Sequence, residues 1–213
     1  MTVVLLHSPL LGPASWSPVA ALLPGAVVPD LRRIARQAPP YWNSVVETVA
    51  AQVPAGPLTL VPHSNAGLFV PLLCQALEVE RCVFVDALLP PAEGSVSSGK
   101  DEQVAFLRKL ADVDGVLPRW TDWWMEPDVA ALFPSKEIRQ RVSEEQPRVP
   151  LDYFEQTVPV PPGWDARPCT YLWYGPPYGD DAREAQARGW TVEQIPGHHL
   201  HHLADPEAVA ARL

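Results

Sequence analysis

The sequence predicts an α/β fold, in which about six mainly parallel strands form a sheet with helices on both faces. Short apolar segments alternate with helix-like segments, as in parallel sheets with helical crossovers. Several apolar segments are rich in Val and Leu, as strands buried on both faces are. The strands are expected at residues 2–6, 26–28, 58–61, 82–85, 169–174 and 191–195.

Helices are expected between these strands. The alternation stops between residues 88 and 164, where helical segments are expected but no clear strand. This stretch is predicted to be a helical insertion over the sheet. Outside it, the helices are expected at residues 15–23, 41–53, 65–78, 181–189 and 205–213, and inside it near 102–111, 127–133 and 135–145.

Composition narrows the classes of function. A net charge of −9 and a pI near 5.1 disfavour nucleic acid and anionic membranes as partners. No apolar run reaches the roughly 18–20 residues of a membrane span, and no signal peptide is apparent at the N-terminus. The odd number of cysteines suggests free thiols. We therefore expect a cytoplasmic protein with a small-molecule substrate, and the sequence leaves the oligomeric state open.

The six histidines fall in three places, each after a predicted strand. His7 ends the first apolar segment, His63 stands beside Ser64 in LTLVPHSNAG, and the remaining four lie in IPGHHLHHLADP. Ligands of parallel sheets bind beyond the carboxyl ends of the strands. A neutral imidazole beside a serine hydroxyl is the usual means of activating that hydroxyl as a nucleophile. The distribution therefore predicts a chemical site.

Ser64 is the candidate nucleophile. The segment around it predicts a strand, a sharp turn and a helix, and Ser64 stands at the turn, as the serine of a nucleophile elbow does. Ala66 and Gly67 are small enough for the close approach of helix and strand, although Pro62 stands where a small residue is usual. The alternative is an ordinary turn in which Ser64 caps the helix.

Three motifs together resemble the α/β-hydrolase family. VVLLHSPLLGPASW is similar to its oxyanion loop, VPHSNAG to its elbow, and IPGHHLHHLADPEAVA to the loop of its catalytic histidine. Serine before histidine is the family's chain order. The resemblance covers residues 2–90 and 167–213. It implies an α/β-hydrolase core at residues 1–88 and 165–213, with residues 89–164 as a helical cap or lid.

The resemblance also implies a catalytic base. Gly197, His199 and Leu200 match the family pattern best, so His199 is the expected base, with His198 as second choice. Histidine-rich tracts can bind metals, but adjacent side chains point apart and no ligand-spaced helix motif is present. No metal or cofactor is therefore expected.

Two carboxylates could orient the base. Asp86 ends the buried strand CVFVD, a position at which some family members carry the acid. Asp180 lies slightly beyond the more usual position, which falls near Tyr178 in GPPYGDD. Helix capping explains Asp180 well, so Asp86 is favoured.

The oxyanion hole departs from the family pattern. The N–H of Asn65 is one expected donor, but the residue that usually supplies the second is Pro9, which has no N–H. The hydroxyl of Ser8 or the N–H of Leu10 could replace it. Hydroxynitrile lyases of this fold carry a threonine hydroxyl at the position of Ser8, so non-hydrolytic chemistry stays open.

The substrate pocket is expected to be aromatic. RWTDWWMEP in the insertion carries Trp120, Trp123 and Trp124, which would cover the site unless they only hold the insertion to the core. His7 and His63 are also expected to contact the substrate.

We therefore expect a cofactor-free enzyme that hydrolyses an ester or thioester of an apolar or aromatic small molecule. A lyase, epimerase or cyclase using the same pocket is the first alternative. A catalytically inactive small-molecule-binding protein of the same fold is the second.

Overall fold

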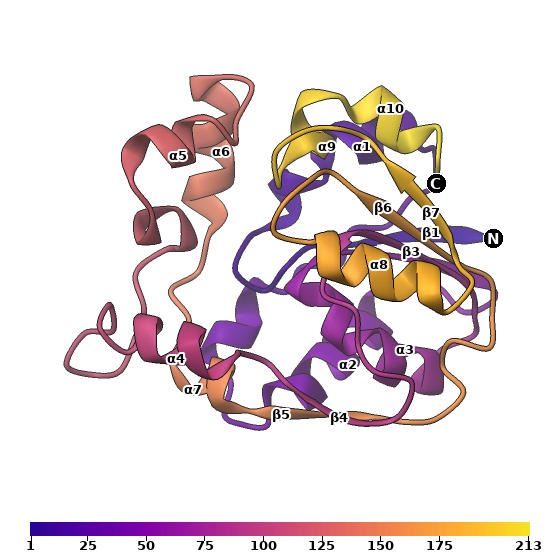
Figure 1. Cartoon of the computed structure of the whole chain (residues 1–213), viewed down its shortest axis with the longest axis horizontal. Helices are drawn as coiled ribbons and strands as arrows, with labels where there is room; N and C mark the ends of the chain where they lie inside the picture. Colours follow the sequence, from indigo (N-terminus) through magenta and orange to yellow (C-terminus); the bar gives the residue numbers. More distant parts are fainter.

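A computed structural model describes residues 1–213 and contains a central sheet of five strands (Figure 1). The strand order is β1-β2-β3-β6-β7, and all four neighbouring pairs are parallel. The predicted α/β class is therefore confirmed. The strands are β1 (Thr2–Leu6), β2 (Leu58–Ser64), β3 (Val79–Ala87), β6 (Cys169–Trp173) and β7 (Thr191–Gln194).

The strand expected at residues 26–28 does not form. Val27 exchanges two backbone hydrogen bonds with β1, to Val3 and Leu5, and makes only an isolated bridge to Val4. Pro29 stands where the next N–H toward β1 would be needed and carries none, so the pairing does not continue past Val27.

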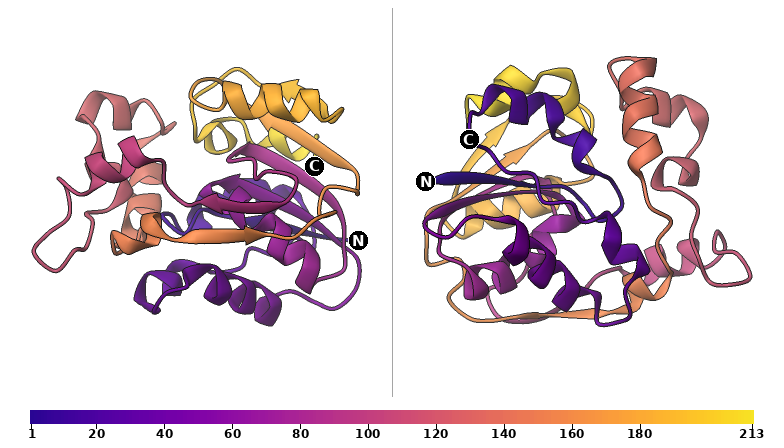
Figure 2. Two further views of the ribbon diagram at one scale, coloured as in Figure 1. Left: turned by 60° about the horizontal axis from the view of Figure 1, so that its bottom comes forward. Right: turned by 180° about the vertical axis from the view of Figure 1, so that it is seen from behind.

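Helices cover both faces of the sheet, as expected (Figure 2). Successive side chains of a strand point to opposite faces. Leu60 and Phe84 accordingly belong to a core with residues of α2, α3 and α8, whereas Val61 and Val83 pack with α1 and α10. These helices are α1 (Ser17–Leu22), α2 (Tyr41–Gln52), α3 (Val70–Ala76), α8 (Gly179–Ala187) and α10 (Pro206–Ala210), and a short α9 (His201–Ala204) precedes α10.

Residues 89–164 contain an element that the sequence analysis missed. The two-stranded antiparallel sheet of β4 (Gly94–Ser97) and β5 (Thr157–Val160) joins the two ends of this stretch, so the expectation of no strand here was wrong. Each strand has four residues and finds its partner far along the chain, which leaves no local signal. The helices between them are α4 (Asp101–Leu107), α5 (Glu126–Ala130), α6 (Lys136–Glu145) and α7 (Asp152–Glu155).

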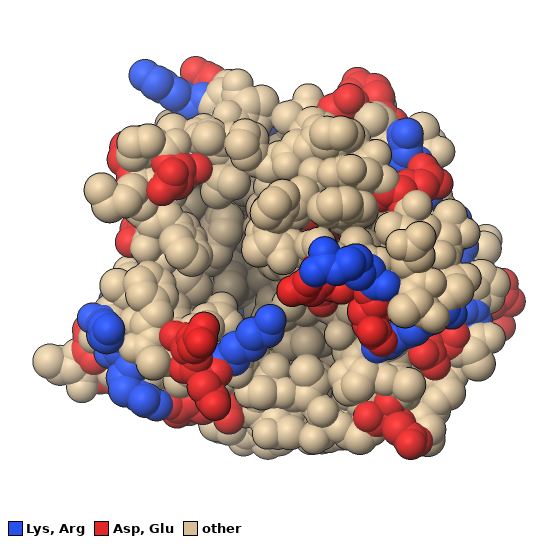
Figure 3. Space-filling model, viewed as in Figure 1, with Lys and Arg blue, Asp and Glu red and all other residues tan.

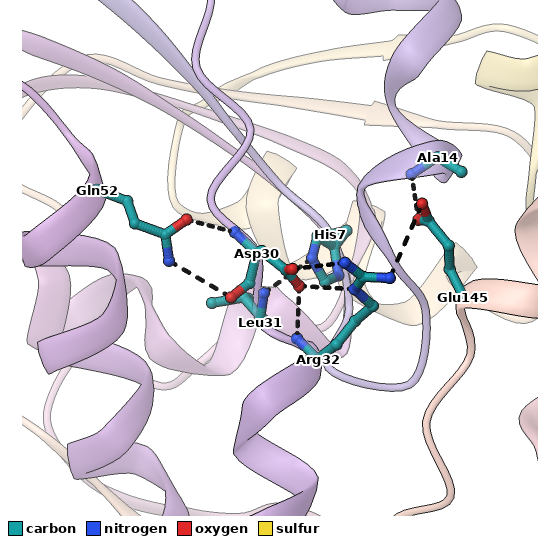
Figure 4. A network of polar contacts seen from close by, with 7 residues as sticks. All are labelled: His7, Ala14, Asp30, Leu31, Arg32, Gln52 and Glu145. Atoms are coloured by element: carbon teal, nitrogen blue, oxygen red, sulfur yellow. Dashed lines mark hydrogen bonds and ion pairs between the residues drawn. The ribbon is translucent and has the colours of Figure 1, made fainter.

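A polar network links α6 to the loop after β1 (Figure 4). The Glu145 carboxylate accepts a hydrogen bond of 2.7 Å from the N–H of Ala14. Arg32 forms an ion pair of 2.7 Å with Asp30 and lies 4.0 Å from Glu145. A side chain at Gly12 would overlap Glu145, so glycine leaves room for the carboxylate. The network holds the insertion against the loop that contains the candidate oxyanion donors.

No helix in the structure is both long and apolar enough to cross a membrane. Cys74, Cys82 and Cys169 are all free, as expected.

Candidate active site

Ser64 stands at the strained turn that the sequence predicts. It ends β2 with φ 59° and ψ −130°, a conformation that a non-glycine residue rarely adopts and that is held only where the surrounding structure enforces it. A 3-10 helix, η3 (Asn65–Phe69), follows at once and leads into α3. A Cβ at Gly67 would overlap the carbonyl oxygen of Leu88, so only glycine allows η3 to lie this close to the end of β3.

His199 connects Ser64 to a carboxylate. Its Nε2 lies 3.0 Å from Ser64 Oγ, and its Nδ1 lies 2.6 Å from Asp86 Oδ2. A carboxylate can only accept, so the neutral ring carries its proton on Nδ1, which leaves Nε2 free to accept from the serine hydroxyl. This geometry allows His199 to remove the proton of Ser64. The sequence pattern predicted Ser64 as nucleophile and His199 as base, and the structure brings the two side chains together.

The two candidate acids have different environments. Asp86 is the penultimate residue of β3 and has φ 43°; its side chain is 1% exposed, and its Oδ1 accepts a hydrogen bond of 3.0 Å from the N–H of Tyr174. Asp180 is 81% exposed on α8 and pairs with Arg183. Only Asp86 contacts the imidazole of His199.

His63 lies behind the candidate base rather than in the substrate cavity. Its ring stacks on that of His199 with centroids 4.5 Å apart, and its Nε2 donates a hydrogen bond of 2.9 Å to the His199 carbonyl oxygen. His202 lies on another side of it, at 4.4 Å. Burial holds the pKa of His63 well below the ordinary value and lowers that of His202 to about 3.

His7 is also fully buried. Its Nδ1 donates to the Ser8 carbonyl oxygen at 2.7 Å, and its Nε2 accepts from the Leu31 N–H at 3.1 Å. Burial lowers its pKa to about 4. His7 and His63, which were expected to contact substrate, are both absent from the lining of the cavity that contains Ser64. Their hydrogen bonds instead fix the loops after β1 and β7.

The expected oxyanion donors differ in whether they line the cavity. Asn65 lines the cavity, and its side chain accepts a hydrogen bond from the Tyr153 hydroxyl of α7. Leu10 also lines the cavity, but its N–H donates to Ser8 Oγ at 3.2 Å. Ser8 is 1% exposed and is not a lining residue. The two substitutes for the missing N–H of Pro9 are thus engaged with each other.

A large cavity opens above Ser64 between the sheet and residues 89–164. Its volume is about 890 Å³, and the space-filling view shows the hollow on this face (Figure 3). Trp120, Trp123 and Trp124 line it, as do Ser64 and His199. The Trp120 ring lies 6.0 Å from the His199 ring, whereas Trp124 is 49% exposed. Aromatic side chains thus form part of the cavity wall, beside charged ones such as Lys100 and Asp181.

Tyr178 is a site residue that the sequence analysis did not select. Its hydroxyl lies 3.3 Å from Ser64 Oγ, and its ring stacks on His199 with centroids 4.9 Å apart and planes at 11°. Burial raises the pKa of the hydroxyl, which is therefore protonated at neutral pH. The sequence does contain a signal, because Tyr178 stands near the place where the family usually carries its acid.

No group of three or more His, Cys, Asp or Glu side chains is arranged to hold a metal ion. His198, the second choice for the base, makes no side-chain hydrogen bond to Ser64 or Asp86, which both contact His199.

Comparisons with known proteins add information on the fold. No family model matches the sequence, and no curated protein matches it. Among solved structures, an extracellular α/β-hydrolase from a Paenibacillus species matches with a TM-score of 0.72 and 18% identity, over 99% of this chain and 96% of that one.

Two further solved structures have similar values. A tomato methylketone synthase I variant has a TM-score of 0.72 and 16% identity, over 99% of this chain and 95% of that one. Polyneuridine aldehyde esterase has a TM-score of 0.66 and 15% identity, over 99% and 96%. With its parallel sheet and strained serine turn, this chain has the α/β-hydrolase fold that its motifs predicted.

Proposed function

We propose that this protein is a cofactor-free serine hydrolase that cleaves an ester or thioester of an apolar or aromatic small molecule. The observation that carries the proposal is the continuous contact from Asp86 to His199 to Ser64, at 2.6 and 3.0 Å, on the floor of the cavity. Nucleophile, base and orienting acid are arranged in this way in serine hydrolases.

The proposed reaction has two stages. Ser64 Oγ attacks the carbonyl carbon while His199 Nε2 takes its proton, and the buried Asp86 stabilises the imidazolium. The imidazolium then protonates the leaving group, which departs and leaves an acyl group on Ser64. A water molecule, deprotonated by His199, releases the acid and restores the serine. The Asn65 N–H, directly after the nucleophile, is positioned by chain order to bind the developing oxyanion.

Solved neighbours support hydrolysis as a class. They include an α/β-hydrolase, an esterase and a pyrethroid hydrolase, together with a methylketone synthase. The aromatic walls formed by Trp120, Trp123 and Trp124 support an apolar or aromatic substrate.

One observation favours a second candidate. Pro9 has no N–H, and the Leu10 N–H is already bound to Ser8 Oγ, so one oxyanion donor is missing from its usual place. Loss of one such donor costs roughly 10²–10³ in rate in a serine hydrolase. A lyase or isomerase, in which His199 moves a proton and Ser64 only positions substrate, depends less on this hole.

The Ser64→Ala variant separates the two candidates. For a hydrolase, it should lose several orders of magnitude in kcat on aromatic-acyl p-nitrophenyl esters, and a fluorophosphonate should label the wild-type protein only at Ser64. Mass spectrometry of the intact protein and its peptides measures the adduct. If the protein is a lyase or isomerase, the fluorophosphonate should form no adduct and ester turnover should stay near background. The non-hydrolytic activity should then fall severely in His199→Ala but only partly in Ser64→Ala. A folded wild-type protein with neither activity nor adduct would indicate an inactive binding protein.

A further inference from the structure

Tyr178 is the polar side chain of the cavity floor that the proposed mechanism leaves without a role. Its hydroxyl approaches Ser64 Oγ to 3.3 Å, and its ring covers one face of His199. Building on the proposed hydrolase, we propose that Tyr178 is a further catalytic residue, whose hydroxyl donates a hydrogen bond to the leaving-group oxygen of an alkyl ester.

The strand order places Tyr178 on the leaving-group side of Ser64. The loop of Ser8 and Leu10 follows β1, on one side of β2 and its terminal Ser64. Tyr178 follows β6 and His199 follows β7, both on the other side of β2. The leaving group must lie next to His199, because His199 returns the proton to it. Because the Tyr178 ring stacks on that imidazole and its hydroxyl lies beside Ser64 Oγ, the hydroxyl is placed to meet the leaving-group oxygen, whereas the oxyanion is assigned to the Asn65 N–H in the proposed mechanism.

The backbone holds Tyr178 firmly in this place. Its carbonyl oxygen accepts the first hydrogen bond of α8, 3.0 Å from the N–H of Ala182, and its own N–H donates to Gly175 at 3.3 Å. The same turn packs on the histidine loop, since the N–H of Gly197 donates to the Tyr174 carbonyl at 3.1 Å. Tyr178 and His199 are thus parts of two joined loops.

The proton balance is simple. When the C–O bond breaks, the electron pair goes to the alcohol oxygen, and the proton that His199 took from Ser64 goes to the same oxygen. Tyr178 keeps its own proton throughout and only stabilises the negative charge that develops on that oxygen. Its ring face also lies parallel to the imidazole, where an aromatic face favours a cation.

This role specifies the substrate class. Phenolate leaving groups are stable anions and need little help, whereas a simple aliphatic alkoxide is a poor leaving group. A hydrogen bond to the leaving oxygen therefore matters for alkyl esters of alcohols, which we infer to be the class that this site is built to cleave.

The test is a series of esters that share one aromatic acyl group and differ in leaving group, from p-nitrophenyl through phenyl to trifluoroethyl and methyl. In Tyr178→Phe, kcat/KM for the methyl ester should fall about 10- to 100-fold, whereas that for the p-nitrophenyl ester should change less than about threefold. The dependence of log kcat/KM on the pKa of the leaving alcohol should become steeper. Tyr41→Phe is the matched control, because the Tyr41 hydroxyl binds Asp152 instead, and it should keep the wild-type slope.

The remaining outcomes overturn the assignment. An equal loss for all esters would make Tyr178 an oxyanion donor or a structural residue, and no loss for any ester would leave it without a role. If wild-type protein cleaves the esters and is labelled at Ser64, such results refute the Tyr178 assignment alone. If it cleaves none and takes no label, the proposed hydrolase fails first and this assignment with it.

Discussion

The floor and the roof of the cavity are built differently. Ser64, Asp86 and His199 stand on strand ends or on a loop of the core, and the first two are held at positive φ by tightly packed backbone. The tryptophans of the roof lie in the stretch from 89 to 164, which is held partly by polar contacts such as that of Glu145 with Ala14. The floor is therefore expected to control chemistry and stability, and the roof to control which substrates bind.

The largest effect is expected at the floor. Asp86→Asn should lower kcat/KM by about 10⁴, because the amide no longer stabilises the His199 imidazolium. Asp180→Asn should stay within about twofold of wild type, since Asp180 is exposed and pairs only with Arg183. Ester kinetics with matched thermal unfolding curves measure both. Equal, near-wild-type rates in the two variants would leave Ser64 and His199 as a dyad.

Acid should destabilise the core through its buried histidines. His7, His63 and His202 are buried with lowered pKa values, so the unfolded chain binds more protons than the folded one below about pH 6.5. Stability should be full above that pH and fall as pH drops toward 4, by up to about 1.4 kcal/mol per pH unit for each histidine. Residues 89–164 contain no histidine.

Urea unfolding at several pH values measures this slope. His202→Phe should reduce it, because one buried titrating ring is removed. A slope that stays unchanged in this variant would show that other groups cause the acid loss.

Substitutions at two glycines compare how rigid the packing is beside Ser64 and where the insertion contacts the core. Gly67→Ala should lower the free energy of unfolding by about 3 kcal/mol, because the new methyl group meets the backbone carbonyl of Leu88, which cannot move aside. Gly12→Ala should cost less, about 1–2 kcal/mol, because the methyl group meets the Cβ and carboxylate of Glu145, so α6 must shift slightly and the contact of Glu145 with Ala14 is weakened, but the sheet is not disturbed. Chemical denaturation of both variants gives the two values. A larger cost at Gly12 would mean that the Glu145 contact is as rigid as the sheet.

Substitutions in the roof should affect catalysis less than those of the proposed catalytic residues. Trp120→Ala should raise KM for aromatic-acyl esters about tenfold, with little change in kcat, because it removes an apolar wall but no reacting group. KM for the corresponding acetate ester should hardly change, since the small acyl group does not reach the wall. A fall in kcat for both esters would instead show that Trp120 positions His199, whose ring lies 6.0 Å away.

Local sequence patterns determined the fold class and identified two residues of the proposed site, Ser64 and His199. Strand–helix alternation and strand-end polar residues are local patterns, so they could predict a parallel sheet, Ser64 and His199. The same local signal predicted one strand too many at residues 26–28, because the register with β1, which puts Pro29 at a donor position, is set only in the folded chain.

The tertiary structure decided which residues that are far apart in the chain contact one another. It brought Asp86 rather than Asp180 to His199, and it buried His7 and His63 behind the cavity. It also paired β4 with β5 and set Tyr178 beside Ser64. These contacts join residues as far as 114 positions apart along the chain, and such distant pairs leave no periodic or local pattern in one sequence. Their geometry follows from the order in which the strands meet.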